Sequence, residues 1–201
     1  MRETNASETD PAQPSDEALV AAVLSGEVNE FDGLVRRYAD RLYSVIYNMI
    51  SNHEDTNDLL MEVFDKAFRN LPKYQQNASF YTWIYRIAVN HTLNFIQKNK
   101  KRRKDMSLNE LSFDDRFEED LEDLRIKSGD SHLELDELQK KLNESLQKLS
   151  EEHRTVVVLY DIDGMPHADI AKILNCSEGT VRSRLHYAHK HLQKLLNTYL
   201  E

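Results

Sequence analysis

Apolar residues recur every three or four positions along most of this chain, the spacing that gathers them on one face of an α-helix. Three long stripes of this kind run from Phe31 to Met49, from Leu60 to Leu71 and from Phe80 to Phe95. Pro72 ends the second stripe, and Ser79 is a suitable N-cap for the third. The spacing therefore predicts three amphipathic helices in the first half of the chain.

A shorter helix is predicted from Asp16 to Leu24, since Ser15 is a typical N-cap and Gly26 a typical residue beyond a helix end. We expect the four helices to form one bundle within residues 15–104, because this is the simplest way to bury every stripe. Five Gly and four Pro are too few for the frequent turns of a β-sandwich or barrel. The predicted fold class is all-α, with two small helical domains.

The second domain is predicted to begin at Ser131, where Ser131-His-Leu-Glu134 has the spacing of a capping box. Leucines continue its apolar stripe at Leu135, Leu138, Leu142, Leu146 and Leu149. The β-branched segment Thr155–Tyr160 is also predicted to be helical, because a lone strand would have no partner. Residues 168–192 then have the pattern of a helix-turn-helix, with the turn at Asn175–Ser177.

The second helix of this motif divides its residues as a DNA-recognition helix requires. Its inner face holds Val181, Leu185, Ala188 and Leu192, and its outer face holds Arg182, Ser183, His186, Tyr187 and Lys190. The exposed first half of a recognition helix enters the major groove and offers donors to the edges of the bases. A plain helical hairpin with a charged outer face would show the same pattern, so the motif alone leaves both possibilities open.

Basic residues are concentrated in two segments although the chain carries a net charge of −9. The first, from Arg86 to Lys104, holds seven bases and no acid, and the second, from Glu178 to Leu195, holds four bases and three histidines against one acid. A negative net charge argues against nucleic-acid binding only when the charges are spread evenly along the chain. Two basic segments on predicted helices indicate a surface for nucleic acid, whereas a single one could equally be a solvated helix face.

A strongly acidic stretch separates the two basic segments. From Asp105 to Leu138 there are thirteen acids against three bases. Dense charge with scattered apolar residues cannot bury enough surface to fold, so residues 105–130 are predicted to be a linker, flexible or only locally helical. Residues 1–14 are predicted to be a disordered tail.

Composition argues against several other functions. The single Cys176 excludes an intramolecular disulfide framework and a Cys-cluster metal site. The five glycines are too widely spaced for a phosphate-binding loop, and no catalytic constellation is evident. The longest apolar runs, Leu19–Leu24 and Val156–Tyr160, are far below the about 20 residues of a membrane span. We therefore expect a soluble cytoplasmic protein with no enzymatic activity, no cofactor, no metal site and no membrane insertion.

Two separate segments carry a resemblance to a known family. One is Ser177-Glu-Gly-Thr-Val-Arg-Ser-Arg-Leu-His186, and the other consists of Asn57-Asp-Leu-Leu-Met-Glu-Val-Phe64 and Phe80-Tyr-Thr-Trp-Ile-Tyr-Arg-Ile-Ala-Val-Asn90. In their order along the chain, these segments resemble those of the extracytoplasmic-function (ECF) sigma factors, the small specificity subunits of bacterial RNA polymerase. The resemblance implies sigma region 2 over residues 15–104 and region 4 over residues 131–201.

A sigma factor of this kind would bind core RNA polymerase, read the −10 and −35 promoter elements and assist DNA melting. The resemblance also implies an anti-sigma factor as a partner, and we expect a monomer when the protein is free. The positions that match the family's polymerase-binding helix are Asp58, Leu59, Glu62, Val63 and Phe64. Met61 stands where the family commonly has Gln, and Val63 and Phe64 are equally suited to core packing.

The third helix and the loop before it resemble the part of the family that captures the unwound −10 element. Tyr74 and Asn90 match positions that line a pocket for a flipped base, and Tyr81 and Tyr85 are candidates to stack on bases. Phosphate contacts are assigned to Lys98, Lys100, Lys101, Arg102 and Arg103. Each stacked base returns roughly 1–3 kcal/mol, which can offset the few kcal/mol that opening a base pair costs.

The last helix would read the −35 element as duplex DNA. Positions that match the family pattern are Arg182, Ser183, Arg184 and His186, and Tyr187 and Lys190 complete the predicted surface. Tyr187 and His189 stand where Arg is usual, so two permanent charges are missing and the preferred −35 sequence cannot be carried over.

Two other functions remain open from the sequence. A stand-alone helix-turn-helix regulator would explain residues 168–192 but not residues 57–64 or 80–104. A sigma-like adaptor would bind an anti-sigma protein without engaging promoters. The acidic linker likewise allows two roles, a solvated tether or a segment that enters the polymerase channel.

Overall fold

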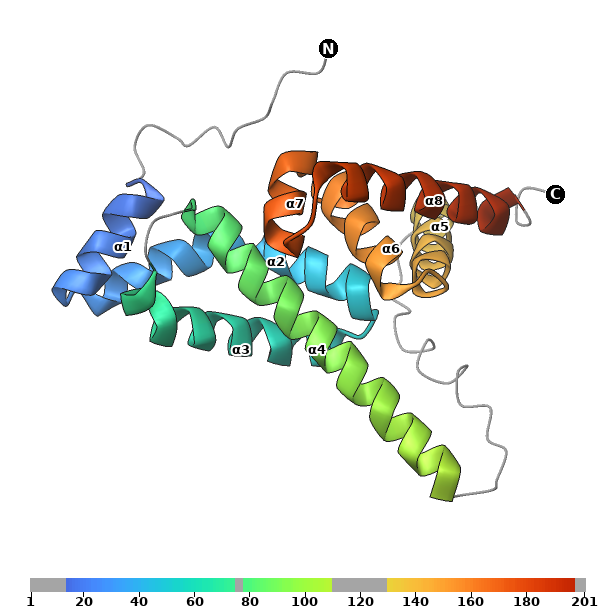
Figure 1. Ribbon diagram of the computed structural model, residues 1–201, viewed down its shortest axis with the longest axis horizontal. Helices are drawn as coiled ribbons and strands as arrows, with labels where there is room; N and C mark the ends of the chain where they lie inside the picture. Colours follow the sequence, from blue (N-terminus) through green and yellow to red (C-terminus); the bar gives the residue numbers. More distant parts are fainter. Residues whose placement is uncertain (1–13, 75–77, 110–129, 198–201) are drawn as a thin grey trace, which may run out of the picture.

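The computed structural model describes residues 14–74, 78–109 and 130–197 and is all-α over these ranges, which confirms the predicted fold class (Figure 1). The helices are α1 (Asp16–Ser25), α2 (Phe31–Ile50), α3 (His53–Asn70), α4 (Phe80–Asn109), α5 (Asp130–Gln147), α6 (Glu151–Val157), α7 (His167–Leu174) and α8 (Glu178–Asn197). Short turns of other helical types are η1 (Val28–Glu30), η2 (Leu71–Lys73) and the π-helical turn η4 (Val158–Ile162). The predicted linker is helical up to Asn109, and its residues 110–129 lie outside the described residues, as do residues 1–13 of the predicted tail.

Helices α1 to α4 form the N-terminal bundle, and local signals set their ends. The side chains of Ser15, Asn52 and Ser79 each accept a hydrogen bond from a backbone N–H three residues on. Gly26 ends α1 in the left-handed conformation, at φ 111°, as a C-terminal glycine commonly does. Gly33 allows α1 to lie close to α2, because a Cβ there would come within 3.1 Å of Leu19.

Helices α5 to α8 form the C-terminal half and contain the predicted helix-turn-helix. Asn175 turns the chain between α7 and α8 in the left-handed conformation, and Ser177 caps the first turn of α8. The inner face of α8 is buried as predicted, at Val181, Leu185, Ala188 and Leu192. The segment Thr155–Tyr160 is helical as predicted, but it widens from α6 into η4.

The two halves pack against each other, a contact that the sequence did not predict. Helices α7 and α6 lie against α4 and α2 in Figure 1. Polar contacts cross the boundary: Arg41 bonds Asp163, Arg86 donates to the carbonyl oxygen of Lys172 at 2.8 Å, and Gln147 donates to that of Asn48 at 3.3 Å. The chain therefore forms one compact body although its helices belong to two sequence segments.

Arg154 of α6 lies at the centre of this contact and is only 7% exposed. Its guanidinium donates to Met49 O at the end of α2 (2.6 Å) and to Leu146 O, Gln147 O and Leu149 O at the end of α5 (2.7 to 3.2 Å). Helix C-termini carry partial negative charge, which suits a cation. Burial lowers the pKa of Arg154, and Glu151 opposes this shift.

We expect Arg154→Met to lower the free energy of unfolding by roughly 3 kcal/mol, because it preserves the apolar stem but leaves buried carbonyl groups without their donor. The matched control is Arg36→Met, which removes an exposed guanidinium from α2. Urea unfolding followed by circular dichroism measures both. Equal stability of the two variants would show that the buried guanidinium contributes nothing net.

Candidate functional site

The outer face of α3 presents only part of the predicted polymerase-binding set. Asp58 and Glu62 are exposed, whereas Leu59, Val63 and Phe64 are at most 9% exposed and pack in the core. Between the two acids lies Met61, whose side chain is 68% exposed. The surface available to a partner is therefore acidic with an apolar centre.

The sequence did not assign two residues of this face to a site. They are Met61 and, two turns further along α3, Phe68, which is 38% exposed. The three buried residues match the family motif because the motif includes core positions. Glu62 is also tied to α4, since its Oε2 lies 2.5 Å from Nε2 of His91. His91 was not assigned to a site, but it directly follows Asn90 in α4. The Glu62–His91 pair therefore links the α3 face to the predicted −10 surface.

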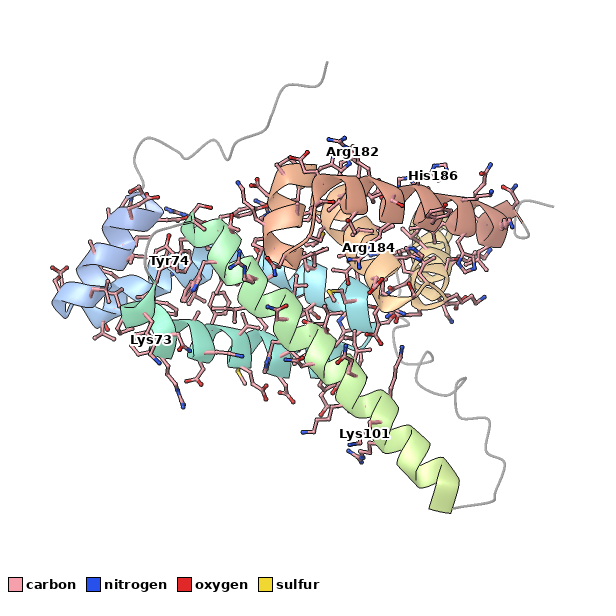
Figure 2. All side chains as sticks on the ribbon, in the orientation of Figure 1. Lys73, Tyr74, Lys101, Arg182, Arg184 and His186 are labelled. Atoms are coloured by element: carbon pink, nitrogen blue, oxygen red, sulfur yellow. The ribbon has the colours of Figure 1, made fainter. Side chains whose placement is uncertain are left out.

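Tyr74 lies between η2 and the start of α4 (Figure 2). Its ring is 5.1 Å from that of Trp83 and 6.0 Å from that of Phe80, centroid to centroid, and its hydroxyl donates to Ala78 O at 2.6 Å. Burial raises the pKa of Tyr74, and Glu17 and Asp16 add to the shift. The ring is thus held in place at the surface, while Trp83 packs partly against the core.

Asn90 is exposed on α4, and the basic residues follow it toward the far end of this long helix, where Figure 2 shows Lys101. Lys98, Lys101 and Arg102 are exposed. Lys100 instead reaches Glu151 of α6, with Nζ 2.6 Å from Oε1. Arg103 belongs to α4 but lies outside the residues whose side chains are described.

Tyr85 faces the C-terminal half rather than solvent, and the half-buried Tyr81 lies beside it. Tyr85 is fully buried, and its hydroxyl donates to Oδ1 of Asp163 at 3.0 Å. The guanidinium of Arg41 lies 5.5 Å from the centre of the Tyr81 ring and 5.9 Å from that of Tyr85. Burial raises the pKa of Tyr81 to about 12 and that of Tyr85 further. In this arrangement Tyr85 offers no face on which a base could stack.

The outer face of α8 carries the predicted recognition set at the edge of the molecule. Arg182, Ser183, His186, Tyr187 and Lys190 are exposed, and Tyr187 is the most exposed aromatic residue among those described, at 59%. Figure 2 shows Arg182 and His186 pointing away from the body and Arg184 on the side toward α6. Exposed donors on a capped helix can reach the edges of bases and phosphates in a major groove.

Several of the basic side chains predicted to bind DNA form ion pairs with acidic side chains of the protein itself. Arg184 lies 3.1 Å from Glu152, and Arg182 lies 3.0 Å from Glu178 on its own helix. With the Lys100–Glu151 pair, three such bases are held by glutamates. Glu151 and Glu152 stand in the first turn of α6, where the helix dipole favours acids. That local preference explains both residues without a partner, so the sequence did not predict their ion pairs.

His189 has an acidic neighbour as well, with Nε2 2.7 Å from Asp161. Among the described residues no group of three or more His, Cys, Asp or Glu is placed to hold a metal ion. The described helices also include none with both the length and the apolar character that crossing a bilayer demands.

Comparison with known families matches both halves of the chain. The model described as sigma-70 region 2 matches residues 34–102, and that described as sigma-70, region 4 matches residues 139–192. These ranges fall on α2 to α4 and on α5 to α8. The two matches therefore cover the two helical halves and leave the acidic segment between them.

Curated relatives are similar over nearly the whole chain. The RNA polymerase sigma-H factor of Pseudomonas aeruginosa is 32% identical over 190 residues, which are 94% of this chain and 97% of the relative. The ECF RNA polymerase sigma-E factors of Haemophilus influenzae and Escherichia coli are each 30% identical, over 90% and 89% of this chain and 95% and 92% of their own lengths.

Solved structures share the fold. CnrH, in complex with the cytosolic domain of CnrY, superposes with a TM-score of 0.66 at 23% identity, covering 91% of this chain and 97% of that one. The sigma factor RpoE of Bartonella quintana, in complex with the anti-sigma factor NepR, gives a TM-score of 0.63 at 22% identity and covers 84% and 97%.

The pairing of Arg184 with Glu152 leads to a prediction about DNA affinity. Glu152→Gln should raise the affinity for duplex DNA at low salt, because it frees a guanidinium for phosphate. The slope of log K against log salt should steepen by about 1. Glu54→Gln on α3 is the matched control, since it makes the same charge change on an exposed residue elsewhere. Fluorescence anisotropy across a salt series measures both, and equal slopes would contradict a masking role for Glu152.

Proposed function

Because this chain belongs to the extracytoplasmic-function sigma factors of the sigma-70 family, we propose that it binds bacterial core RNA polymerase and directs it to promoters. The observation that carries the proposal is the outer face of α8, which presents Arg182, Ser183 and His186 while the inner face is buried. The chain contributes binding and sequence preference. It is an initiation factor and not an enzyme, since the polymerase supplies the catalysis.

The −35 element would be read by the first half of α8. Arg182 can bond one guanine through two donors, a contact worth about 1–3 kcal/mol of discrimination against a wrong base. Ser183 and His186 lie on the same exposed face and can donate to bases or phosphates. Lys190, one turn beyond His186, and Tyr187 would contact the flanking backbone. Arg184 would take part after leaving Glu152.

The −10 element would be captured near the start of α4. Tyr74 provides an aromatic ring held by its neighbours, and the exposed Asn90 can offer a paired donor and acceptor to one base edge. Lys98, Lys101 and Arg102 would neutralise phosphates further along the helix, a contribution that does not depend on sequence and weakens with salt. Stacking supplies the free energy for melting, so no nucleotide hydrolysis is needed.

The exposed face of α3 would bind core polymerase. Asp58 and Glu62 suit a basic partner, and Met61 between them adds an adaptable apolar contact. Leu59, Val63 and Phe64 would act indirectly, by packing α3 against its neighbours.

We also retain the predicted organisation, with a tail at residues 1–14, region 2 at 15–104, the acidic linker at 105–130 and region 4 at 131–201. The protein would act in the cytoplasm as a monomer before it meets the polymerase, and an anti-sigma factor would control it. A stand-alone helix-turn-helix regulator is a poorer explanation, because similarity to the curated sigma factors extends over α2 to α4 as well as α8.

The direct test is titration of the protein into bacterial core polymerase, followed by size-exclusion chromatography. We expect co-elution near one to one for the native chain and about tenfold weaker binding for Asp58→Ala/Glu62→Ala. The control is Asp32→Ala/Asp40→Ala, which removes two exposed acids from α2. If the native chain forms no complex while another sigma factor binds normally, the proposed function is wrong.

Asn90→Ala should reduce run-off transcription and relax preference within the −10 element by about 1–3 kcal/mol at one position, because one base loses its paired bonds. Asn94→Ala, an exposed asparagine one turn further along α4, should leave both unchanged. In vitro transcription from a promoter library randomised in the −10 element gives both quantities. Unchanged preference in the Asn90 variant would refute its assignment.

A further inference from the structure

Tyr187 is an aromatic residue on a face of α8 that is otherwise polar or basic. It is 59% exposed, and Ser183 and Lys190 lie about one turn before and one turn after it on the same face. The packing of α8 does not account for the ring, since the buried inner face of this helix consists of other residues. A ligand that covers the ring would remove apolar surface from water, which favours binding.

Two features of α8 lie next to the ring of Tyr187. The ring of His186 is 5.5 Å away, centroid to centroid, with an interplanar angle of 74°. Tyr187 also borders a shallow hollow of about 160 Å³, which Lys190, His191 and Lys194 line as well. The exposed ring therefore stands between another aromatic side chain and a group of basic ones.

The hollow next to Tyr187 suits an anion. None of the four residues that line it is acidic. The one acid of α8, Glu178, lies 3.0 Å from Arg182, and Asp161 of η4 is bonded to His189, which does not line the hollow. A phosphate of the DNA backbone is a suitable occupant, because basic side chains neutralise its charge.

The position of Tyr187 along α8 places it close to the residues that the proposed function assigns to base reading. It follows Arg182 by five residues, which corresponds to about 7.5 Å along the helix axis. Base pairs in a duplex are about 3.4 Å apart. With α8 in the major groove, the ring would lie within about two base pairs of the pair that Arg182 reads.

The C5-methyl group of thymine is the group in the major groove that an aromatic ring recognises best. The other groups that distinguish the bases there are hydrogen-bond donors and acceptors, which the five N–H donors of an Arg read better than a ring does. The methyl group is apolar, so its contact with a ring removes both surfaces from water. The hydroxyl group of Tyr187 can still bond the flanking backbone while the ring makes this contact.

We propose that Tyr187 determines part of the sequence specificity of α8 by placing its ring against the C5-methyl group of a thymine in the −35 element, while the basic hollow beside it takes a backbone phosphate. This inference rests on the proposed function and names a base that the proposed function leaves open. It gives the exposed ring and the hollow one common ligand, the duplex in which Arg182 and Ser183 read neighbouring bases.

The test uses the full-length chain in complex with core polymerase and a promoter library randomised in the −35 element. Arg182→Ala marks one position by its loss of preference. Within about two base pairs of it, the native chain should prefer thymine over cytosine by about fourfold, the effect of covering one methyl group. Tyr187→Phe should keep this preference, Tyr187→Ala should lose it, and Tyr187→Arg should shift it toward guanine.

A change in the DNA isolates the methyl group. Uracil in place of that thymine removes only the C5-methyl group, so it should weaken binding of the native chain and of Tyr187→Phe by about fourfold and leave Tyr187→Ala unaffected. Uracil in place of a thymine outside the −35 element is the DNA control. Tyr160→Ala, which removes an exposed tyrosine from η4, is the matched protein control and should keep the native preference.

The phosphate contact has a separate measurement. Lys190→Gln should lower the slope of log K against log salt by about 1 and leave the thymine preference unchanged. An unchanged slope would overturn the role of the hollow. Circular dichroism confirms that each variant is folded.

The outcomes distinguish this inference from the function on which it rests. Failure of the native chain to bind core polymerase would overturn the proposed function. Normal promoter binding with the same response to uracil in the native chain and in Tyr187→Ala would overturn the thymine contact alone. Weaker polymerase binding by Tyr187→Ala with an unchanged base preference would assign the ring to a protein contact and would equally overturn the inference.

Discussion

One buried cation, Arg154, bonds both halves of the protein at once. Arg154 joins the carbonyl ends of α2 and α5, two helix termini that would otherwise bury acceptors without donors. All but one of its described acceptors are backbone oxygens, the exception being the side-chain oxygen of Gln147, so helix C-termini as well as the nearby Glu151 face its charge. Arg154 thereby holds α6 against the end of α2, while Asp163 and the backbone of α7 make separate contacts with the N-terminal bundle.

The local pairing of charged residues describes the surface of this protein better than its net charge does. The chain is acidic overall, yet two groups of basic residues are concentrated in the later part of α4 and on α8. Acids of the first turn of α6 stabilise that helix and also hold Lys100 and Arg184. The same carboxylates therefore serve folding and occupy the positions that phosphates would take. Nucleic acid would have to displace an internal partner at these sites, as well as water.

Most of the local structure could be predicted from the sequence, because helical periodicity and caps act over a few residues. The stripes, the caps at Ser15 and Ser79 and the inner face of α8 are observed as expected. Contacts between distant residues left no comparable signal: Arg41 and Asp163 are 122 positions apart, and each alone reads as a surface charge. For the same reason Tyr85 was assigned by its motif, although the structure buries its ring completely.

The π-helical turn η4 restricts where residues can be inserted into or deleted from this chain. A π turn is equivalent to one residue inserted into an α-helix, and here it is closed by the bond from Asp163 N to Val158 O at 2.9 Å. Each residue of an α-helix turns the chain by about 100°. Removing one residue between Val158 and Ile162 would rotate Asp163 away from α2 and α4 and would turn the whole helix-turn-helix with it. Among relatives that share this joint, insertions and deletions should therefore be tolerated between α4 and α5 but excluded between α6 and α7.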